Sequence, residues 1–307
     1  MIQEYIDNQQ YQEALKLLGN LEDEQTRYLR LVCLFGLQEY NQAYQEIKFA
    51  KNNAKETYYD IVAMEVGILK ELQQFEEAIN ILIEELSMPY IPYQYESTFN
   101  AAYDDILLAK QEATSDVEYK NSGFNIDEIA NILSKEVVNE DILYMCIENM
   151  QNINIRKVLP EIRMFLKSSN KPDFAKSLII ELLIDQAIDE EMIVHKFNHD
   201  FEINPSYAQM VLQQEIANDI LMALSRNIED DNPSLFIMAE QYANYYLYCI
   251  YPKYVDETDA NIIAGAIHYH LATLQFIEVE LEDIEILYQV DANEVLEMIE
   301  KFKNIQL

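Results

Sequence analysis

The chain has 307 residues, half of them hydrophobic, and a formal net charge of −34. A charge of this size repels the phosphates of nucleic acids and anionic lipids, so neither is expected as a partner. With only 5 glycines and 7 prolines, the composition also argues against β-sandwiches, barrels and doubly wound sheets, whose turns require such residues. The composition therefore predicts an all-α protein.

Three segments near the N-terminus share one pattern, in which an aromatic residue is followed by two polar residues, an alanine and an aliphatic run. The segments are Tyr11–Leu18, Tyr40–Ile47 and Phe75–Leu82. The alanines are Ala14, Ala43 and Ala78. A polar turn and an apolar helix precede each segment. Two antiparallel helices approach closely only where one side chain is small, so each segment is interpreted as the second helix of a hairpin.

These segments resemble tetratricopeptide repeats, whose unit has roughly 34 residues. The resemblance covers about residues 1–90 and implies an α-solenoid with a groove for a peptide or protein. The repeats are degenerate, because the chain lacks tryptophan and because Leu31 and Val66 replace the small residue of the first helix. Tyr28 and Tyr59 are predicted to contact the partner.

The repeat domain is predicted to span residues 1–110. After two prolines that end a helix, apolar spacing predicts another helix over 96–109. Residues 111–125 are polar and are assigned as a linker. Asn125, followed by Glu128, resembles a helix N-cap, so a second domain is predicted over 126–307.

The second domain is predicted to be helical and of the kind found in HEAT-type solenoids. Helices are expected at 126–136, 139–150, 159–168, 173–186, 206–226, 233–251 and 258–277, followed by a short helix, a turn and a last helix. Residues 188–205 alternate apolar and polar side chains and are the one segment expected to form a β-hairpin. The acidic last helix disfavours a DNA-reading role.

Basic residues concentrate in one stretch of this acidic chain. They are Arg156, Lys157, Arg163, Lys167, Lys171 and Lys176. The first four are candidate contacts for an acidic partner, or for self-association with the acidic C-terminal part. The remaining acidic surface is interpreted as solvated helix faces.

Cys33, Cys146 and Cys249 are widely spaced in apolar runs, so they are predicted to be free, buried thiols in a reducing compartment. The N-terminus does not resemble a signal peptide, and no stretch reaches the roughly 18 apolar residues of a membrane span. These features predict a cytoplasmic protein. His195 and His199 lack the order of a zinc motif, so no metal site is expected.

The sequence contains no glycine-rich phosphate loop and no nucleophile elbow. It therefore predicts a non-enzymatic, cofactor-free scaffold that binds a protein or peptide. The alternative is an enzyme or small-ligand-binding protein with a pocket at the junction of the two halves, lined by Tyr90, Tyr93, Tyr95 and residues 188–205. A third hypothesis is an acidic mimic of nucleic acid.

The whole chain is also similar to uncharacterised Firmicute proteins with N-terminal tetratricopeptide repeats. The run from Phe165 to Pro205 and the segment from Asn232 to Pro252 carry this resemblance. It implies an architecture and no particular activity.

Overall fold

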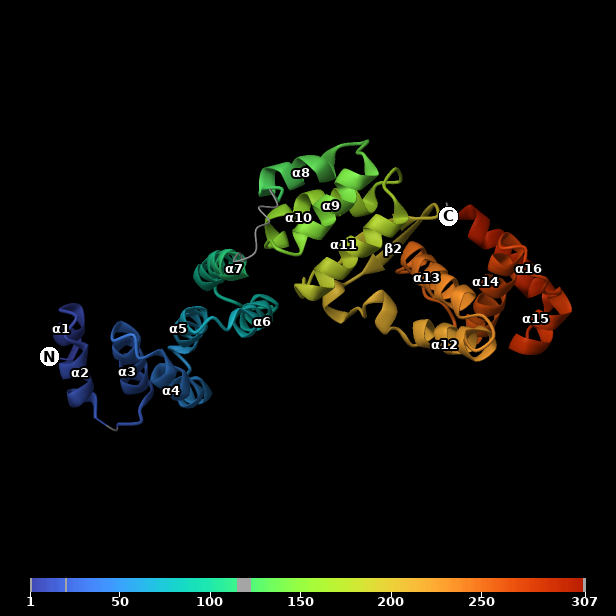
Figure 1. Cartoon of the computed structure of the whole chain (residues 1–307). Helices are drawn as coiled ribbons and strands as arrows, with labels where there is room; N and C mark the ends of the chain where they lie inside the picture. Colours follow the sequence, from blue (N-terminus) through green and yellow to red (C-terminus); the bar gives the residue numbers. More distant parts are fainter. Residues whose placement is uncertain (1, 20, 115–122, 306–307) are drawn as a thin grey trace. The chain divides into compact units, whose positions relative to one another are not determined.

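The computed structural model describes residues 2–19, 21–114 and 123–305. Contacts within the chain divide it into two compact units. Unit 1 comprises residues 1–123 with 152–154, and unit 2 comprises 124–151 with 155–307. Helices dominate both units (Figure 1), and the described residues form one two-stranded sheet, which confirms the predicted all-α class.

Unit 1 is a series of helices in which each one packs against the next along the chain (Figure 1). Its described helices are α1 (Ile2–Asp7), α2 (Tyr11–Leu18), α3 (Glu24–Gly36), α4 (Tyr40–Asn53), α5 (Tyr58–Glu71), α6 (Phe75–Leu86) and α7 (Tyr93–Thr114). Three hairpins result, and each predicted alanine signature forms the second helix of one hairpin. The predicted repeat architecture is therefore confirmed.

The signature alanines lie where the paired helices cross. Ala14, Ala43 and Ala78 are fully buried. Ala43 shares a core cluster with Leu31 of the preceding helix, and Ala78 shares one with Val66. A large side chain on the first helix thus packs against a small one on the second, which lets the hairpin close although neither first helix carries a small residue at this point.

The hairpins turn through glutamines in the left-handed backbone region. Gln9, Gln38 and Gln73 have φ angles of 58°, 60° and 57°. After each glutamine, the next amide bonds back across the helix end, as Glu39 N–H does to the Leu34 carbonyl at 3.0 Å. This Schellman arrangement satisfies the last carbonyls of the first helix. It explains how a chain with few glycines forms tight helical turns.

Helix α7 is longer than the helix predicted over 96–109. It begins at Tyr93, directly after Pro92, and it continues to Thr114. The Pro92 carbonyl accepts hydrogen bonds from the first turn of the helix. Proline fixes its own φ near the helical value and has no N–H to leave unpaired, so a helix starts readily beside it. This start lies N-terminal to the apolar spacing that indicated the helix.

The linker predicted over 111–125 therefore starts inside α7. Its middle, residues 115–122, lies outside the described residues. At its end, the Asn125 side chain accepts a hydrogen bond from Glu128 N–H at 3.0 Å, and the Glu128 carboxylate accepts one from Asn125 N–H at 2.9 Å. This capping box starts α8 at the position predicted from the sequence.

The described residues of unit 2 form helices and one β-hairpin. Its helices are α8 (Ile126–Ser134), α9 (Glu140–Met150), α10 (Leu159–Lys167), α11 (Asp173–Asp185), α12 (Glu215–Leu224), α13 (Pro233–Ile250), α14 (Ala260–Leu274), α15 (Leu281–Tyr288) and α16 (Ala292–Asn304). Helix α14 contacts α12, α13, α15 and α16. It is buried on most sides, which agrees with its small and aliphatic side chains.

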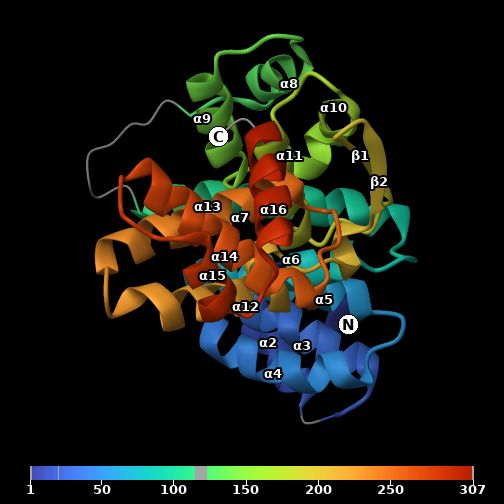
Figure 2. The same cartoon turned by 90° about the vertical axis from the view of Figure 1, so that its right-hand side faces the viewer.

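The β-hairpin predicted within 188–205 is present. Strands β1 (Met192–Lys196) and β2 (His199–Ile203) pair antiparallel. Side chains of β1 alternate between buried and partly or fully exposed, which is the period-two pattern that predicted the strand. Figure 2 shows the hairpin beside α10, which contacts β1.

The helix predicted over 206–226 is wrong in its first part. This region contains 3-10 turns at Pro205–Tyr207 and Val211–Gln213, helix α12, and a π-helical turn at Ser225–Glu229. Before α12, Val211 N–H donates to Glu181 Oε1 at 3.0 Å. The Gln209 carbonyl accepts from the Tyr251 hydroxyl at 2.9 Å. These tertiary hydrogen bonds occupy backbone groups that a helix would need.

Candidate partner-binding surface

Helices α3, α5 and α7 form one side of unit 1. Helix α3 contacts α5, and α5 contacts α7, in addition to the contacts within each hairpin. Among the described residues, the second helices do not pack on one another as closely. The hairpins therefore curve toward the side formed by α3, α5 and α7, called the inner face below. The inner face is defined by Tyr28, Val32, Phe35, Asp60, Ala63, Gly67, Tyr95 and Ala102.

Two contacts show how α5 aligns with its neighbours on the inner face. At one end, the Tyr95 hydroxyl of α7 donates to Asp60 Oδ1 at 2.9 Å. Further along α5, a Cβ built on Gly67 would lie 3.6 Å from the Phe35 ring of α3. Helical spacing places Asp60 and Gly67 on the same side of α5, two turns apart. The inner face thus has a polar aromatic end at Asp60 and an apolar middle at Gly67.

Aromatic packing fixes the polar end. The rings of Tyr59 and Tyr95 stack with centroids 5.0 Å apart and planes inclined by 25°. Tyr58 meets Tyr59 edge to face at 5.3 Å. Phe99 is fully buried, and its ring centroid lies 6.2 Å from that of Tyr95. This packing holds Tyr95 with its hydroxyl directed at Asp60.

The carboxylate of Asp60 dominates the electrostatics at this end. Among the described residues of unit 1, no lysine or arginine forms an ion pair with it. Burial, together with the charge of Asp60, raises the pKa of Tyr28. The hydrogen bond to Asp60 raises the pKa of Tyr95. Both phenols therefore stay protonated well above neutral pH.

Glu24 connects the starts of α3 and α5. Its Oε1 accepts hydrogen bonds from Lys55 N–H, Thr57 N–H and the Thr57 hydroxyl, each at 2.8 Å. These bonds stabilise the carboxylate and lower the pKa of Glu24 to about 2. The contact sets the spacing between two inner-face helices. No sequence pattern indicates this contact, because Glu24 is one of many acidic residues at helix starts.

The sequence-predicted contacts Tyr28 and Tyr59 both belong to this region, on α3 and α5. Their role in binding a partner stays a prediction. The alternative ligand pocket placed Tyr90, Tyr93 and Tyr95 together. Tyr95 belongs to the inner face, whereas Tyr90 and Tyr93 are 90% and 86% exposed.

Within the basic stretch of unit 2, two lysines are buried and do not contribute to a charged surface. Lys171 donates to the Lys135 carbonyl, and its ammonium lies 4.9 Å from the centre of the Phe165 ring. Lys176 donates to the His195 carbonyl. Burial lowers the pKa of both lysines.

The four predicted contacts in this stretch differ in their surroundings. Arg156 donates to the Gln186 carbonyl at 2.7 Å. Arg163 forms an ion pair with Glu190. Lys157 and Lys167 are exposed. The two arginines therefore form contacts within unit 2. The assignment of all four residues to an acidic partner stays a prediction.

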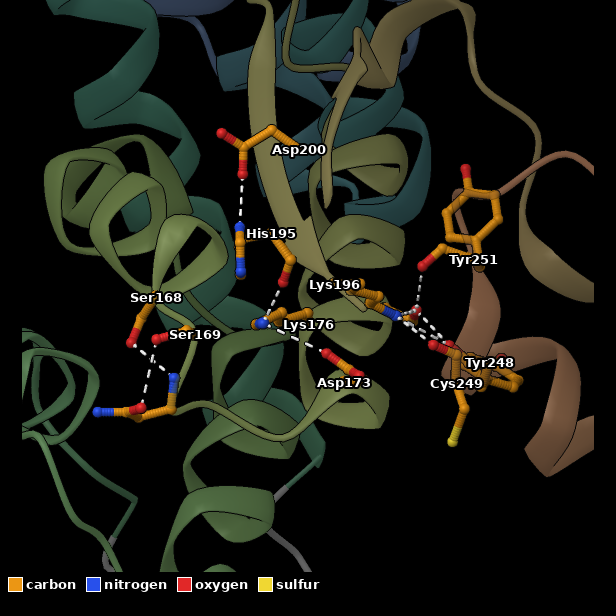
Figure 3. A network of polar contacts seen from close by, with 12 residues as sticks. Ser168, Ser169, Asp173, Lys176, His195, Lys196, Asp200, Tyr248, Cys249 and Tyr251 are labelled. Atoms are coloured by element: carbon orange, nitrogen blue, oxygen red, sulfur yellow. Dashed lines mark hydrogen bonds and ion pairs between the residues drawn. The ribbon is translucent and has the colours of Figure 1, made fainter. Parts of the chain in front are cut away.

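A buried polar network lies at the end of α13 (Figure 3). Lys196 Nζ donates to Ser177 Oγ at 2.8 Å, to the Cys249 carbonyl at 2.9 Å and to the Tyr248 carbonyl at 3.2 Å. The Ser177 hydroxyl donates to the same Tyr248 carbonyl at 2.5 Å. The last carbonyls of a helix have no intrahelical partner. A lysine from β1 and a serine from α11 supply that partner here.

An amine beside a serine hydroxyl is also an arrangement that activates nucleophiles. Ser177 and Lys196, however, are 0% and 1% exposed, so a substrate has no route to the hydroxyl. Burial lowers the pKa of Lys196 to about 7. We interpret the network as the connection that holds the β-hairpin against α11 and α13.

The histidines do not converge on a metal site. His195 Nδ1 lies 2.6 Å from Asp200 Oδ1 across the hairpin, and the His199 ring packs edge-on against Phe201. In unit 2, His268 is buried with its Nδ1 3.1 Å from the Tyr288 hydroxyl. In the part of the chain that the structure describes, no group of three or more His, Cys, Asp or Glu side chains is arranged to hold a metal ion.

Two further findings concern the cysteines and the helices of the described residues. Cys33, Cys146 and Cys249 are free and buried, as predicted. None of the helices formed by the described residues has both the length and the apolar character required to cross a membrane.

The stacked hairpins and their inner face define a helical-repeat structure. The chain is similar to the TPR repeat-containing protein YsoA of Bacillus subtilis (strain 168), with 21% identity over 318 residues. The match covers 98% of this chain and 90% of that protein, so it extends through unit 2. It confirms the predicted resemblance to Firmicute tetratricopeptide-repeat proteins. No protein-family profile and no solved structure matches the chain.

Proposed function

We propose that this protein is a non-enzymatic scaffold that binds a protein or peptide on the inner face of unit 1. The observation that carries the proposal is a set of partly exposed aromatic and apolar residues on α3, α5 and α7, where α5 packs against both other helices. Tyr28 and Phe35 lie on α3, Gly67 on α5, and Tyr95 on α7. An elongated surface of this kind suits an extended segment, since repeat proteins use such surfaces for binding.

Gly67 supports this assignment. A glycine inside a helix is less favourable than alanine by roughly 0.5–1 kcal/mol, so its position calls for a reason. Its own neighbours do not require it, because a Cβ there would meet the Phe35 ring at 3.6 Å, an ordinary van der Waals distance. A bare backbone in the middle of the inner face instead leaves room for another molecule to approach closely.

The Ser177–Lys196 pair, which is the amine–hydroxyl arrangement described above for unit 2, does not support a catalytic role. The Ser177–Lys196 pair is enclosed, and its hydrogen bonds are directed to the end of α13. It thus serves the fold. The similarity to a protein described as a TPR repeat-containing protein also supports a scaffold.

Selection of displayed random peptides on the full-length chain tests the proposal. The same selection is run on a Gly67→Gln variant, in which a long side chain would fill the middle of the inner face. Asn80→Gln places the same side chain on an exposed position of α6 and serves as the control. Peptides enriched on the wild type and the control are expected to lose binding to Gly67→Gln. Peptides that bind all three proteins equally, or an absence of enriched peptides, would contradict the proposal.

A further inference from the structure

The polar end of the inner face holds a carboxylate that has no cationic partner among the described residues. Asp60 is partly exposed and accepts a hydrogen bond from Tyr95, whose ring stacks on that of Tyr59. Tyr28 of α3 is close enough for the charge of Asp60 to raise its pKa. We infer that this end of the inner face binds a lysine or arginine side chain of an extended peptide segment, an inference that rests on the proposed function of the inner face as a peptide-binding surface.

Asp60 retains hydrogen-bonding capacity. The Tyr95 hydroxyl occupies one acceptor site on Oδ1, and an ionised carboxylate has about four such sites. A charge-assisted bond from an ammonium or guanidinium is stronger than a bond between neutral groups. The remaining capacity of Asp60 therefore matches a cationic donor better than a neutral one.

The basic side chains on the inner-face helices α3, α5 and α7 are engaged with other carboxylates. Arg30 of α3 lies 3.4 Å from Glu46, and Lys70 of α5 lies 2.5 Å from Asp105. Within the described part of unit 1, the charge of Asp60 is thus left for a group from another molecule.

The surrounding rings suit the same cation. The faces of tyrosine rings are electron-rich and attract ammonium and guanidinium groups. Tyr59 and Tyr95 stack at 5.0 Å, so their positions are set before a ligand arrives. Pre-positioned rings lose little conformational freedom on binding. The net charge of −34 further favours the approach of a basic segment over an acidic one.

The apolar middle of the inner face adds a second feature to the ligand. Gly67 follows Asp60 by two helical turns, a rise of roughly 10 Å at about 1.5 Å per residue. An extended peptide advances about 3.3 Å per residue, so roughly three residues span this distance. The expected ligand therefore has a basic residue and an apolar residue about three positions apart, the apolar one packing beside Phe35 and Gly67.

Peptides selected on the wild-type chain provide the probe. Their affinities are measured by fluorescence anisotropy against the wild type and against Asp60→Asn, which keeps the shape of the side chain and an acceptor for Tyr95. Glu71→Gln removes one charge at an exposed position of α5 and is the control. We expect selected peptides to share a lysine or arginine, and Asp60→Asn to weaken binding at least tenfold while Glu71→Gln leaves it within twofold.

A second variant, Tyr28→Leu, removes a ring and keeps the carboxylate, and it is expected to weaken the same peptides severalfold. Circular dichroism establishes that each variant is folded. Peptides without a basic residue that bind Asp60→Asn as well as the wild type, yet lose binding to Gly67→Gln, would overturn this inference and leave the proposed function intact. Peptides insensitive to Gly67→Gln would overturn the proposed function itself.

Discussion

The ring of Tyr11 lies directly over Gly36. A Cβ built on Gly36 would approach Cε2 of Tyr11 to 2.4 Å, far inside van der Waals contact. Tyr11 is the aromatic residue of the first repeat signature, and Gly36 ends α3 of the second hairpin. The contact therefore joins two successive hairpins, and it explains a glycine that the backbone conformation alone does not require.

Gly36→Ala is expected to lower the free energy of unfolding by about 1–2 kcal/mol, because the Tyr11 ring must move away from its packed position. Urea denaturation followed by circular dichroism measures the change. Combining the substitution with Tyr11→Leu should relieve most of the loss, since the shorter side chain removes the clash. An unchanged stability in Gly36→Ala would show that the ring shifts at no cost.

Gly67→Ala is expected to act in the opposite direction. Its Cβ would meet Phe35 at an ordinary 3.6 Å, so no clash opposes the higher helix propensity of alanine. The free energy of unfolding should rise by about 0.5–1 kcal/mol. The same denaturation experiment measures it, and a loss of stability would indicate that the inner face is more tightly packed than the structure shows.

Gln38→Gly is expected to stabilise the second hairpin. Gln38 has a φ of 60°, a conformation that is unfavourable for residues with a Cβ and free of that penalty for glycine. Glycine also makes the unfolded chain more flexible, which offsets part of this benefit. The free energy of unfolding should therefore rise by about 0.5–1 kcal/mol. The control Gln42→Gly, inside α4, should instead cost about 1 kcal/mol. Equal effects at both positions would contradict this explanation of the turn.

The hairpins were predictable because their determinants are local. An aromatic residue and an alanine three positions later lie on one helical face, and the pattern repeats along the chain. The polar end of the inner face was less predictable. The hydrogen bond between Tyr95 and Asp60 joins residues 35 positions apart, and it depends on how far each hairpin is rotated relative to the next. Periodicity within one helix contains no information about that rotation.

The buried lysines show a similar limit. Lys176 belongs to the basic stretch of the sequence, whereas in the structure it is 1% exposed and donates to the His195 carbonyl. Lys196 reaches the Cys249 carbonyl across 53 positions of sequence. Lysine is almost always a surface residue, so composition predicts exposure. Only the fold shows that a carbonyl of β1 lies within reach of the Lys176 ammonium group, and that the last carbonyls of α13 lie within reach of Lys196.

Glu24→Gln is expected to destabilise unit 1 at neutral pH, because an amide is a weaker acceptor than a carboxylate for the three donors at Lys55 and Thr57. The pKa of Glu24 is lowered from 4.5 to about 2, so its contribution is complete above pH 4.5 and is lost as the pH falls toward 2. Thermal melts of wild type and variant should therefore differ at pH 7 and converge near pH 2. Glu13→Gln, exposed on α2, controls for the loss of one charge and should show no such convergence.

Lys196→Met tests the network at the end of α13. Burial lowers the pKa of Lys196 from 10.5 to about 7, so between these values the unfolded chain binds a proton that the folded chain lacks. The contribution of Lys196 to stability should therefore rise with pH across this window, by at most about 1.4 kcal/mol per pH unit.

The raised pKa values of the buried cysteines act in the opposite sense, but both proteins contain them. Urea denaturation at several pH values from 7 to 10 measures the free energy of unfolding of both proteins. The value for the wild type should increase with pH relative to the value for Lys196→Met. Parallel profiles would mean that the ammonium remains protonated in the folded state, held by the carbonyls of Tyr248 and Cys249.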